Sequence, residues 1–567
     1  MNFKAITLAI VLLIAAEQCR AKNILCLLGV GTQTTNKWNY ALLNELEQRD
    51  HHLTVVTSNP ANEFEDSFLN AEFIHLEKTQ TFLRQRYEAL THAELLHQST
   101  WKFVVHWYDR QMATCRANLE SIGFSEALHL AVKEKRQYDL IIYDVTYGAG
   151  CLLHLAYLFG QTPIVGLASG HLNVQNLLPL SVAAGELLNP SLHPYVLSDF
   201  GRDMSYWRRW HNNALYAFDY LYRKLLVNPV IEGIWSTNMQ SKSIVTPKKF
   251  DKLLPRFKAI LANYHPSLHT LQSLPNYIVP VPGLHIQGPQ KLNEDVLKFV
   301  ESFKKEVILI DMEKNLLDSD HSQALLDVIK QFPNNGFVWI NAKGKVSGKN
   351  GGKNLLQLNN VEAGQILGHD KVKCAIVLPE LLNVQEALYH GVTPLTITTS
   401  PEQRYLAQRL LERKLGLNLE LYKFDKTQLH DTLKSCLNDK TLHKNAQQFS
   451  ASLKKQPNPS LETAIWWVEH ISENPQAQDH LLDAKSSLSF LALRGLDILL
   501  VVEIFLVLCA VNSVFILRQT FLNFKNAAQK AKAKAKKSVN ERAVDVVRKE
   551  KKLSADKKEK KAKAKTS

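Results

Sequence analysis

An apolar stretch from Ile498 to Leu517 constrains this chain more than any other feature of its sequence. About 20 apolar residues are enough to cross a hydrocarbon core of about 30 Å as a helix. The stretch is followed, from Arg518 to Ser567, by 18 Lys and Arg and by only 5 Asp and Glu. Positively charged flanks of a membrane helix stay on the cytosolic side. The sequence therefore predicts a transmembrane helix over 498–517 and a basic cytosolic tail over 518–567.

The first residues predict a cleaved leader. Lys4 precedes an apolar run from Ala5 to Ala16, and small residues at Cys19 and Ala21 favour cleavage after Ala21. The run has about a dozen residues, too few to span a bilayer. We therefore expect a signal peptide over 1–21 and a single-pass type I protein of the endoplasmic reticulum membrane, with a lumenal body. Lys563 and Lys565 near the C-terminus resemble a dilysine-type retrieval signal.

The positive charge of the chain lies almost entirely in the tail. The tail's 18 basic and 5 acidic residues give it +13, against +14 for the whole chain, so the body is nearly neutral. A high positive charge often indicates nucleic-acid binding, but here a membrane helix tethers the charged segment. We expect no nucleic-acid partner, and anionic lipid headgroups as the neighbours of the tail. The alternative is a solvated, disordered tail without a specific partner.

The cysteines of the body give little support for a disulfide scaffold or a metal site. They are few for the length of the body, odd in number, and without metal-ligand spacing. The sequence predicts free, buried cysteines and no metal. The five are Cys26, Cys115, Cys151, Cys374 and Cys436.

The body alternates between short apolar runs and stretches of helical spacing, and it is larger than one core usually supports. Continuous apolar runs indicate buried parallel strands. They lie at 23–28, 53–57, 140–144 and 164–168, and again at 307–310, 337–340, 374–378 and 395–398. Prolines between 275 and 289 predict a linker between the two sets. We expect an α/β fold with two doubly wound parallel-sheet domains, 22–280 and 281–480, and ligands at the carboxyl ends of the strands.

Several motifs give the chain a family likeness. It resembles the animal UDP-glycosyltransferases, of the UDP-glucuronosyltransferase-like kind, as a divergent member. That resemblance implies a GT-B fold and transfer of a hexosyl or glucuronosyl group from a UDP-sugar, as co-substrate, to a small lipophilic acceptor, without a cofactor. The motifs are Gly283-Leu284-His285-Ile286, Ile366-Leu367-Gly368-His369, Glu386 to Val392, Trp467-Val468-Glu469, His480-Leu481 and Leu496-Asp497.

The general base expected from this resemblance is missing. In the family, a histidine held by an aspartate deprotonates the acceptor, and its Ser-His pair falls on Thr34-Thr35 of this chain. No histidine occurs between residues 22 and 50. Asp144, in the position of the partnering aspartate, therefore has Thr35 where its histidine would be. We expect His51 and His52, at the other end of that helix, to be exposed surface residues.

The donor side of the resemblance is also altered. The family's His-Gly-Gly becomes Leu378-Pro379-Glu380, and a proline without an N–H together with a carboxylate opposes binding of a diphosphate. The uridine motif Trp-x-Pro-Gln reads 360–363, without the tryptophan, and Ser-x-Gly-Ser reads 311–314, without the glycine. Glu386 is retained for the ribose, and Glu402-Gln403 for the sugar hydroxyls. Glu386 could equally be a packing residue, and we expect structural roles for His369 and His390.

Two functions remain open at this point. The chain could be an active membrane-bound glycosyltransferase with a degenerate catalytic and donor site. It could instead be an inactive pseudoenzyme that binds a lipophilic ligand or a partner glycosyltransferase, as a homo- or hetero-oligomer. Titration of the body with UDP and a UDP-sugar separates these alternatives.

Overall fold

The fold is seen in a computed structural model. It describes residues 21–29, 33–59, 65–82, 92–146, 151–172, 190–246, 253, 256–270, 274, 277–312, 316–317, 319–340, 352–359, 361–476 and 496–563. The chain divides into two compact units, one up to Leu488 and one from Ser489 onward. Except for Ala21, the predicted leader lies outside the described residues.

The first half of the body is built around a seven-stranded parallel sheet with the strand order β3-β2-β1-β4-β5-β6-β7. Its central strands β1, β4 and β5 are buried nearly throughout, because helices cover both faces. The strands are β1 Asn23–Leu28, β2 His52–Thr57, β3 Glu72–His75, β4 Leu140–Asp144, β5 Ile164–Ala168, β6 Phe257–Ala262 and β7 Ile278–Pro280. The helical segments are α2 Gln33–Gln48, η1 Glu65–Ser67, α4 His92–Leu96, α5 Thr100–Glu120, α6 Ile122–Val132, α7 Cys151–Leu155, η2 Ala156–Phe159, α9 Tyr206–Tyr222, η4 Arg223–Val227 and α10 Asn228–Ser241.

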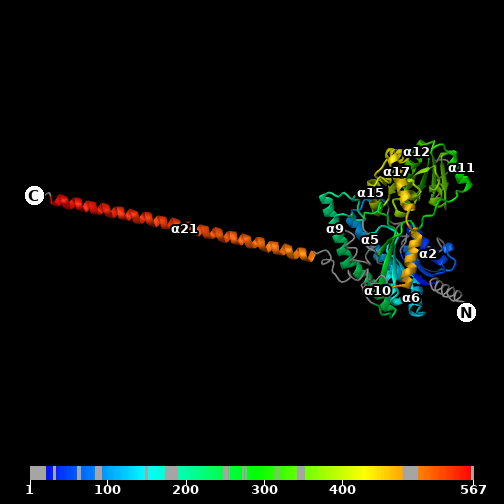
Figure 1. The fold of residues 1–567 in the computed structure, drawn as a ribbon, viewed down its shortest axis with the longest axis horizontal. Helices are drawn as coiled ribbons and strands as arrows, with labels where there is room; N and C mark the ends of the chain where they lie inside the picture. Colours follow the sequence, from blue (N-terminus) through cyan, green and yellow to red (C-terminus); the bar gives the residue numbers. More distant parts are fainter. Residues whose placement is uncertain are drawn as a thin grey trace, which may run out of the picture. The chain divides into compact units, whose positions relative to one another are not determined.

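The second half repeats this design with a six-stranded parallel sheet in the order β10-β9-β8-β11-β12-β13. Figure 1 shows its helices α11, α12 and α17 on one side of the body and α2, α6 and α10 of the first half on the other. The strands are β8 Val307–Asp311, β9 Gly336–Ile340, β10 Leu355–Leu358, β11 Val372–Val377, β12 Thr393–Thr398 and β13 Leu417–Glu420. The helical segments are α11 Glu294–Ser302, α12 Ser319–Gln331, α13 Ala363–Leu367, α14 Leu381–Tyr389, η8 Pro401–Gln403, α15 Arg404–Glu412, α16 Lys426–Asn438, α17 Lys440–Lys454 and α18 Ser460–Glu473. The prediction of two doubly wound parallel sheets is confirmed.

Part of the predicted linker belongs to the first sheet. Strand β7, Ile278–Pro280, pairs with β6 although it ends in a proline. The strand is the last of its sheet, and a proline without an N–H is tolerated at an edge. The apolar residues Ile278 and Val279 favour the strand because both become buried against the sheet.

Helix α18 returns from the second half of the chain to the first sheet. It contacts α2, β4 and β6. Its inward face is buried completely and joins a core cluster that also contains residues of both sheets. The two halves of the body are therefore joined by a shared hydrophobic core as well as by the linker. The buried residues of this face are Ala464, Ile465, Val468 and Ile471.

The prediction of free cysteines is wrong for four of the five in the body. Cys115 is joined to Cys151, with Cα atoms 5.1 Å apart, and Cys374 to Cys436, with Cα atoms 5.9 Å apart. The partners are 36 and 62 residues apart in sequence, and they meet only because α5 packs on α7 and α16 on β11. Cys26 is free and buried, as expected.

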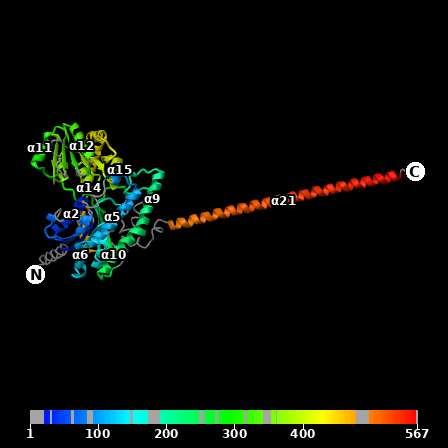
Figure 2. The same cartoon turned by 180° about the vertical axis from the view of Figure 1, so that it is seen from behind.

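The second unit contains one long helix, α21, from Leu496 to Lys563 (Figure 2). Its N-terminal part is long and apolar enough to cross a membrane, which agrees with the span predicted over 498–517. The basic tail continues the same helix, so a disordered tail is not what the structure shows. The abundance of Ala, Lys and Glu explains this result, because all three residues have high helix propensity.

Candidate active site

Asp144 lies at the carboxyl end of β4, at the centre of the first sheet. Its side chain is buried, and both of its oxygens accept hydrogen bonds. The amide of Asn39 on α2 donates to Oδ2 over 3.0 Å, and the backbone N–H of Thr146 donates to Oδ1 over 2.8 Å. The helix that follows β1 and the turn that follows β4 therefore hold this carboxylate in one orientation.

Burial raises the pKa of Asp144 to about 6, although the hydrogen bonds from Thr146 and Asn39 favour the charged form. Desolvation disfavours a carboxylate because the interior replaces water with a less polar medium. At neutral pH most of the side chain is still ionised. Asp144 can consequently accept a proton, with a pKa close to the pH at which it would work.

Thr35 lies on the first turns of α2 and is buried. Two asparagines near it on α2 place their side-chain amides at the carboxyl ends of the strands: Asn36 contacts Asn59, and Asn39 contacts Asp144. The hydrogen-bond donors to Asp144 include the amide of Asn39 and the hydroxyl and backbone N–H of Thr146. That Asp144 lacks a histidine partner stays a prediction.

On the donor side, Glu386 is buried on α14 and accepts a hydrogen bond from the backbone N–H of Gly364. A Cβ at position 364 would lie 2.9 Å from Oε1 of Glu386, so the end of that side chain would have to shift if glycine were replaced. Desolvation raises the pKa of Glu386 to about 7; attraction by Lys37 opposes the rise, and repulsion from Asp311 and Glu362 adds to it. Glu386 is therefore a carboxylate that the protein itself has partly neutralised.

Lys37 joins the two halves of the site. It extends from α2 to Glu362, which immediately precedes α13, with Nζ 2.5 Å from Oε2. Burial lowers its pKa, but attraction by Glu386, Glu362 and Asp311 outweighs this effect, so the pKa of Lys37 is raised. The ammonium group is thus a counter-ion for three carboxylates of the second half. Sequence analysis missed this contact because its partners are 325 residues apart and Lys37 belongs to no motif.

Glu402 and Gln403 lie in η8, after β12. Oε1 of Gln403 accepts hydrogen bonds from the backbone N–H of Thr399, over 2.8 Å, and from its hydroxyl, over 3.2 Å. The side chain of Gln403 therefore stabilises the turn between Thr399 and Gln403. Glu402 differs, since one of its carboxylate oxygens is buried without a hydrogen-bond partner among the described residues.

The altered diphosphate motif, residues 378–380, directly precedes α14, and its last residue carries a carboxylate. Glu380 is the N-cap residue of α14 and has extended backbone angles, and its backbone N–H donates to the carbonyl of Leu378. A negative charge at this end of a helix stabilises the helix through its dipole. It also repels an anionic ligand.

Three histidines of the second half lie in a turn, at a helix end or in the interior. Nδ1 of His369 accepts the backbone N–H of Lys371 in the turn before β11. His390 is the C-cap residue of α14, and burial lowers its pKa to about 4. Burial and the charge of Lys37 lower the pKa of His285 to about 3, which keeps that ring neutral. These placements agree with structural roles for His369 and His390.

His51 contradicts its prediction. It is 7% exposed, because α18 covers it, and it contacts Glu469 of that helix. His52, the first residue of β2, is exposed as expected. No group of three or more His, Cys, Asp or Glu side chains within the described part of the chain could hold a metal ion.

Comparison with known proteins places this geometry in context. The chain is 25% identical over 494 residues to UDP-glycosyltransferase UGT4 of Dactylopius coccus, covering 84% of this chain and 91% of that protein. It is 25% identical over 500 residues to UDP-glucuronosyltransferase 2B1 of Rattus norvegicus, covering 84% and 88%. It is 23% identical over 533 residues to UDP-glucuronosyltransferase 2B15 of Homo sapiens, covering 87% and 92%.

Among solved structures, the chain is similar to glycosyltransferase VinC in complex with DTDP, with a TM-score of 0.52 and 14% identity, over 80% of this chain and 99% of that one. This likeness shows the fold alone, two facing parallel-sheet domains of the GT-B type. The sequence profile of UDP-glucoronosyl and UDP-glucosyl transferases matches residues 28–536. With that match over nearly its full length, this chain belongs to the UDP-glucoronosyl and UDP-glucosyl transferase family.

Proposed function

We propose that this protein transfers a hexosyl or glucuronosyl group from a UDP-sugar to a small lipophilic acceptor at the lumenal face of the endoplasmic reticulum membrane. The observation that supports this most directly is Asp144, a buried carboxylate with a pKa of about 6 at the carboxyl end of β4. A free imidazole has a pKa of about 6.5. Burial has therefore given Asp144 nearly the basicity of the histidine that the chain lacks.

In the proposed reaction, Asp144 takes the proton of an acceptor hydroxyl. The hydroxyl oxygen attacks the anomeric carbon of the donor, and the bond from that carbon to the diphosphate breaks, with its electron pair leaving on UDP. Glu386 binds the ribose hydroxyls, which requires it to exchange Lys37 for the ligand. The unpartnered oxygen of Glu402 accepts a hydroxyl of the transferred sugar.

The experiment is a turnover assay on the full chain in membranes, with UDP-glucose or UDP-glucuronic acid and a panel of phenols and sterols. We expect acceptor-dependent release of UDP. Asp144→Asn should lower kcat/KM by about 10²- to 10⁴-fold, the usual contribution of a general base. The exposed Asp199→Asn is the control and should be unchanged. Absence of transfer with every donor, or full activity of Asp144→Asn, would contradict the proposal.

A second candidate is a binding protein that no longer transfers sugar, and the contact of Lys37 with Glu362 favours it. Three carboxylates around one ammonium leave this part of the site with excess negative charge, and Glu380 adds to it. Such a site repels a diphosphate. Calorimetry on the purified full chain distinguishes the two: micromolar binding of UDP excludes the second candidate, and no binding at millimolar UDP excludes the first.

A further inference from the structure

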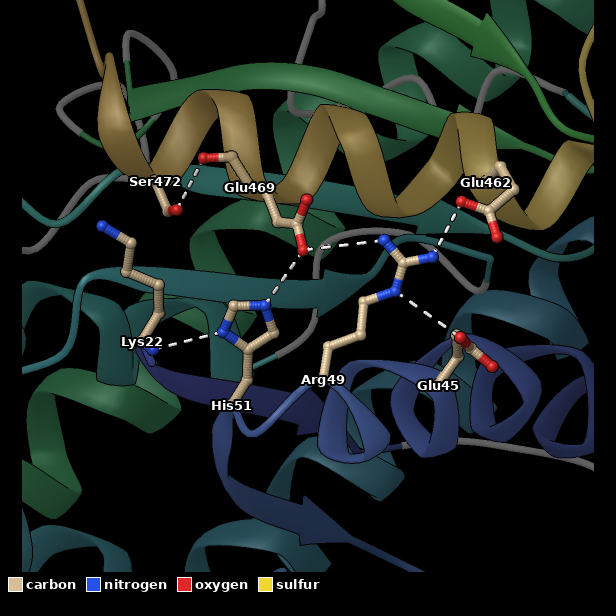
Figure 3. Close-up of polar contacts among 7 residues, drawn as sticks. All are labelled: Lys22, Glu45, Arg49, His51, Glu462, Glu469 and Ser472. Atoms are coloured by element: carbon tan, nitrogen blue, oxygen red, sulfur yellow. Dashed lines mark hydrogen bonds and ion pairs between the residues drawn. The ribbon is translucent and has the colours of Figure 1, made fainter. Parts of the chain in front are cut away.

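His51 lies at a junction of three segments that are far apart in the sequence. Its Nδ1 is 3.2 Å from the backbone nitrogen of Lys22, which donates to it, and its Nε2 is 3.3 Å from Oε1 of Glu469 on α18 (Figure 3). Because Nδ1 accepts, a neutral ring carries its proton on Nε2 and donates it to Glu469. The ring therefore connects the start of β1 to α18.

The surroundings of this junction are rich in carboxylates. Arg49 contacts Glu462 over 2.7 Å, Glu45 over 3.5 Å and Glu469 over 4.0 Å (Figure 3). Asp139 lies beside the start of β1, where it accepts the backbone N–H of Asn23 over 2.8 Å. Arg49 thus faces three carboxylates, and the fourth, Asp139, lies at the start of β1. A further positive charge at the backbone nitrogen of Lys22 would complement them.

The backbone of Lys22 contacts two residues at the start of β2. Besides its N–H contact with His51, its carbonyl accepts the backbone N–H of His52 over 2.8 Å. Ala21, the residue before it, is exposed and outside β1. The bond between Ala21 and Lys22 is also the one at which the leader is predicted to be cut. The predicted cleavage site thus directly precedes a residue whose backbone is hydrogen-bonded to the first half of the body.

We propose that the leader is cut between Ala21 and Lys22, and that the new amino terminus of Lys22 docks on His51 and, through it, on Glu469. Hydrolysis adds one water to this amide and yields the carboxylate of Ala21 and the α-ammonium group of Lys22. That group has three N–H donors and a positive charge in place of one neutral N–H. Removal of the leader therefore strengthens the attachment of α18 to the first sheet.

The cut site is tested on the full chain expressed in animal cells. Free amines of the purified protein are blocked by dimethylation, and the N-terminal peptide is identified by mass spectrometry. We expect a mature chain that begins at Lys22. A chain that begins at Arg20, as cleavage after Cys19 would give, or one that keeps its leader, overturns the proposal, because the nitrogen of Lys22 then stays an amide.

The docking is tested by a cycle of variants. Ala21→Leu blocks cleavage after residue 21, so the nitrogen of Lys22 stays an amide, and mass spectrometry verifies this. We expect its thermal midpoint to be about 2–4 °C below that of the natural chain. The same comparison in a His51→Leu background should show no difference, whereas the exposed His52→Leu should preserve it.

Equal midpoints for the natural chain and Ala21→Leu would contradict docking, as would a difference that persists without His51. If His51→Leu does not fold, Glu469→Gln takes its place, because it removes only the charge at the end of the relay. In that background the effect of Ala21→Leu should be reduced. An undiminished effect would overturn the proposal.

Discussion

The negative charge of Asp144 lies in the interior, where burial disfavours the ionised carboxylate. Its pKa is raised from 3.8 to about 6, so the folded body holds the proton more tightly than the unfolded chain does. The charge therefore costs stability above pH 6, by on the order of 2–3 kcal/mol, and the cost disappears as the pH falls towards 4. Residues that carry such a cost are often kept for function.

We expect Asp144→Asn to raise the free energy of unfolding by on the order of 1–3 kcal/mol at pH 8, with little gain at pH 4. The neutral amide avoids the desolvation penalty but keeps the size of the side chain. Urea denaturation at both pH values measures the difference, with the exposed Asp199→Asn as control. A variant that is less stable at pH 8 would show that the charge of Asp144 is needed by the fold.

Lys37 and Glu362 should be coupled, but only modestly. Their side chains are 31% and 59% exposed, so water and salt screen the pair, and a double-mutant cycle with alanine should give about 0.2–1 kcal/mol. Lys37→Ala should also tighten binding of uridine, the neutral nucleoside, because the attraction of the ammonium group no longer competes with the ribose hydroxyls for Glu386. Weaker binding of uridine would instead show that Lys37 helps to bind the nucleoside.

At the level of elements, Gly364 of α13 lies against the carboxylate of Glu386 on α14. Gly364→Ala would place a methyl group 2.9 Å from Oε1 of Glu386 and push that carboxylate away from the N–H of residue 364, so we expect a loss of about 0.5–1.5 kcal/mol in the free energy of unfolding. Gly233 in α10 has no atom within 4 Å of an added Cβ, and Gly233→Ala is the matched control. It should stabilise the chain by about 0.5–1 kcal/mol through helix propensity. Equal effects of the two substitutions would contradict this packing.

The elements that sequence analysis predicted best are the central strands. The runs 23–28, 140–144 and 164–168 coincide with β1, β4 and β5, because strands buried on both faces must be apolar at every position. Edge strands were harder. β3 and β13 are short and only partly buried, so their sequences lack a continuous apolar signal, and β7 has only three residues, the last of them a proline.

For the whole molecule, we predict a protease-protection pattern in sealed microsomes. Added trypsin should remove the Lys-rich tail and leave the body intact, since the positive tail stays in the cytosol. The two disulfides suit an oxidising lumen for the body. Digestion of the body without detergent would reverse the orientation. Salt extraction should leave the chain in the membrane, because the span is apolar.

The sequence by itself determined the two parallel sheets and an apolar helix long enough to span a membrane, and it predicts the loss of the base at Thr35, because each of these depends on residue types or on periodicity along the chain. Only the tertiary structure decided which groups meet. Lys37 meets Glu362, His51 meets Glu469, and Cys374 meets Cys436, across separations of 325, 418 and 62 residues. Local patterns carry no record of such distances. The raised pKa of Asp144 is also a tertiary effect, because it is caused by burial, and the burial of a side chain depends on the fold.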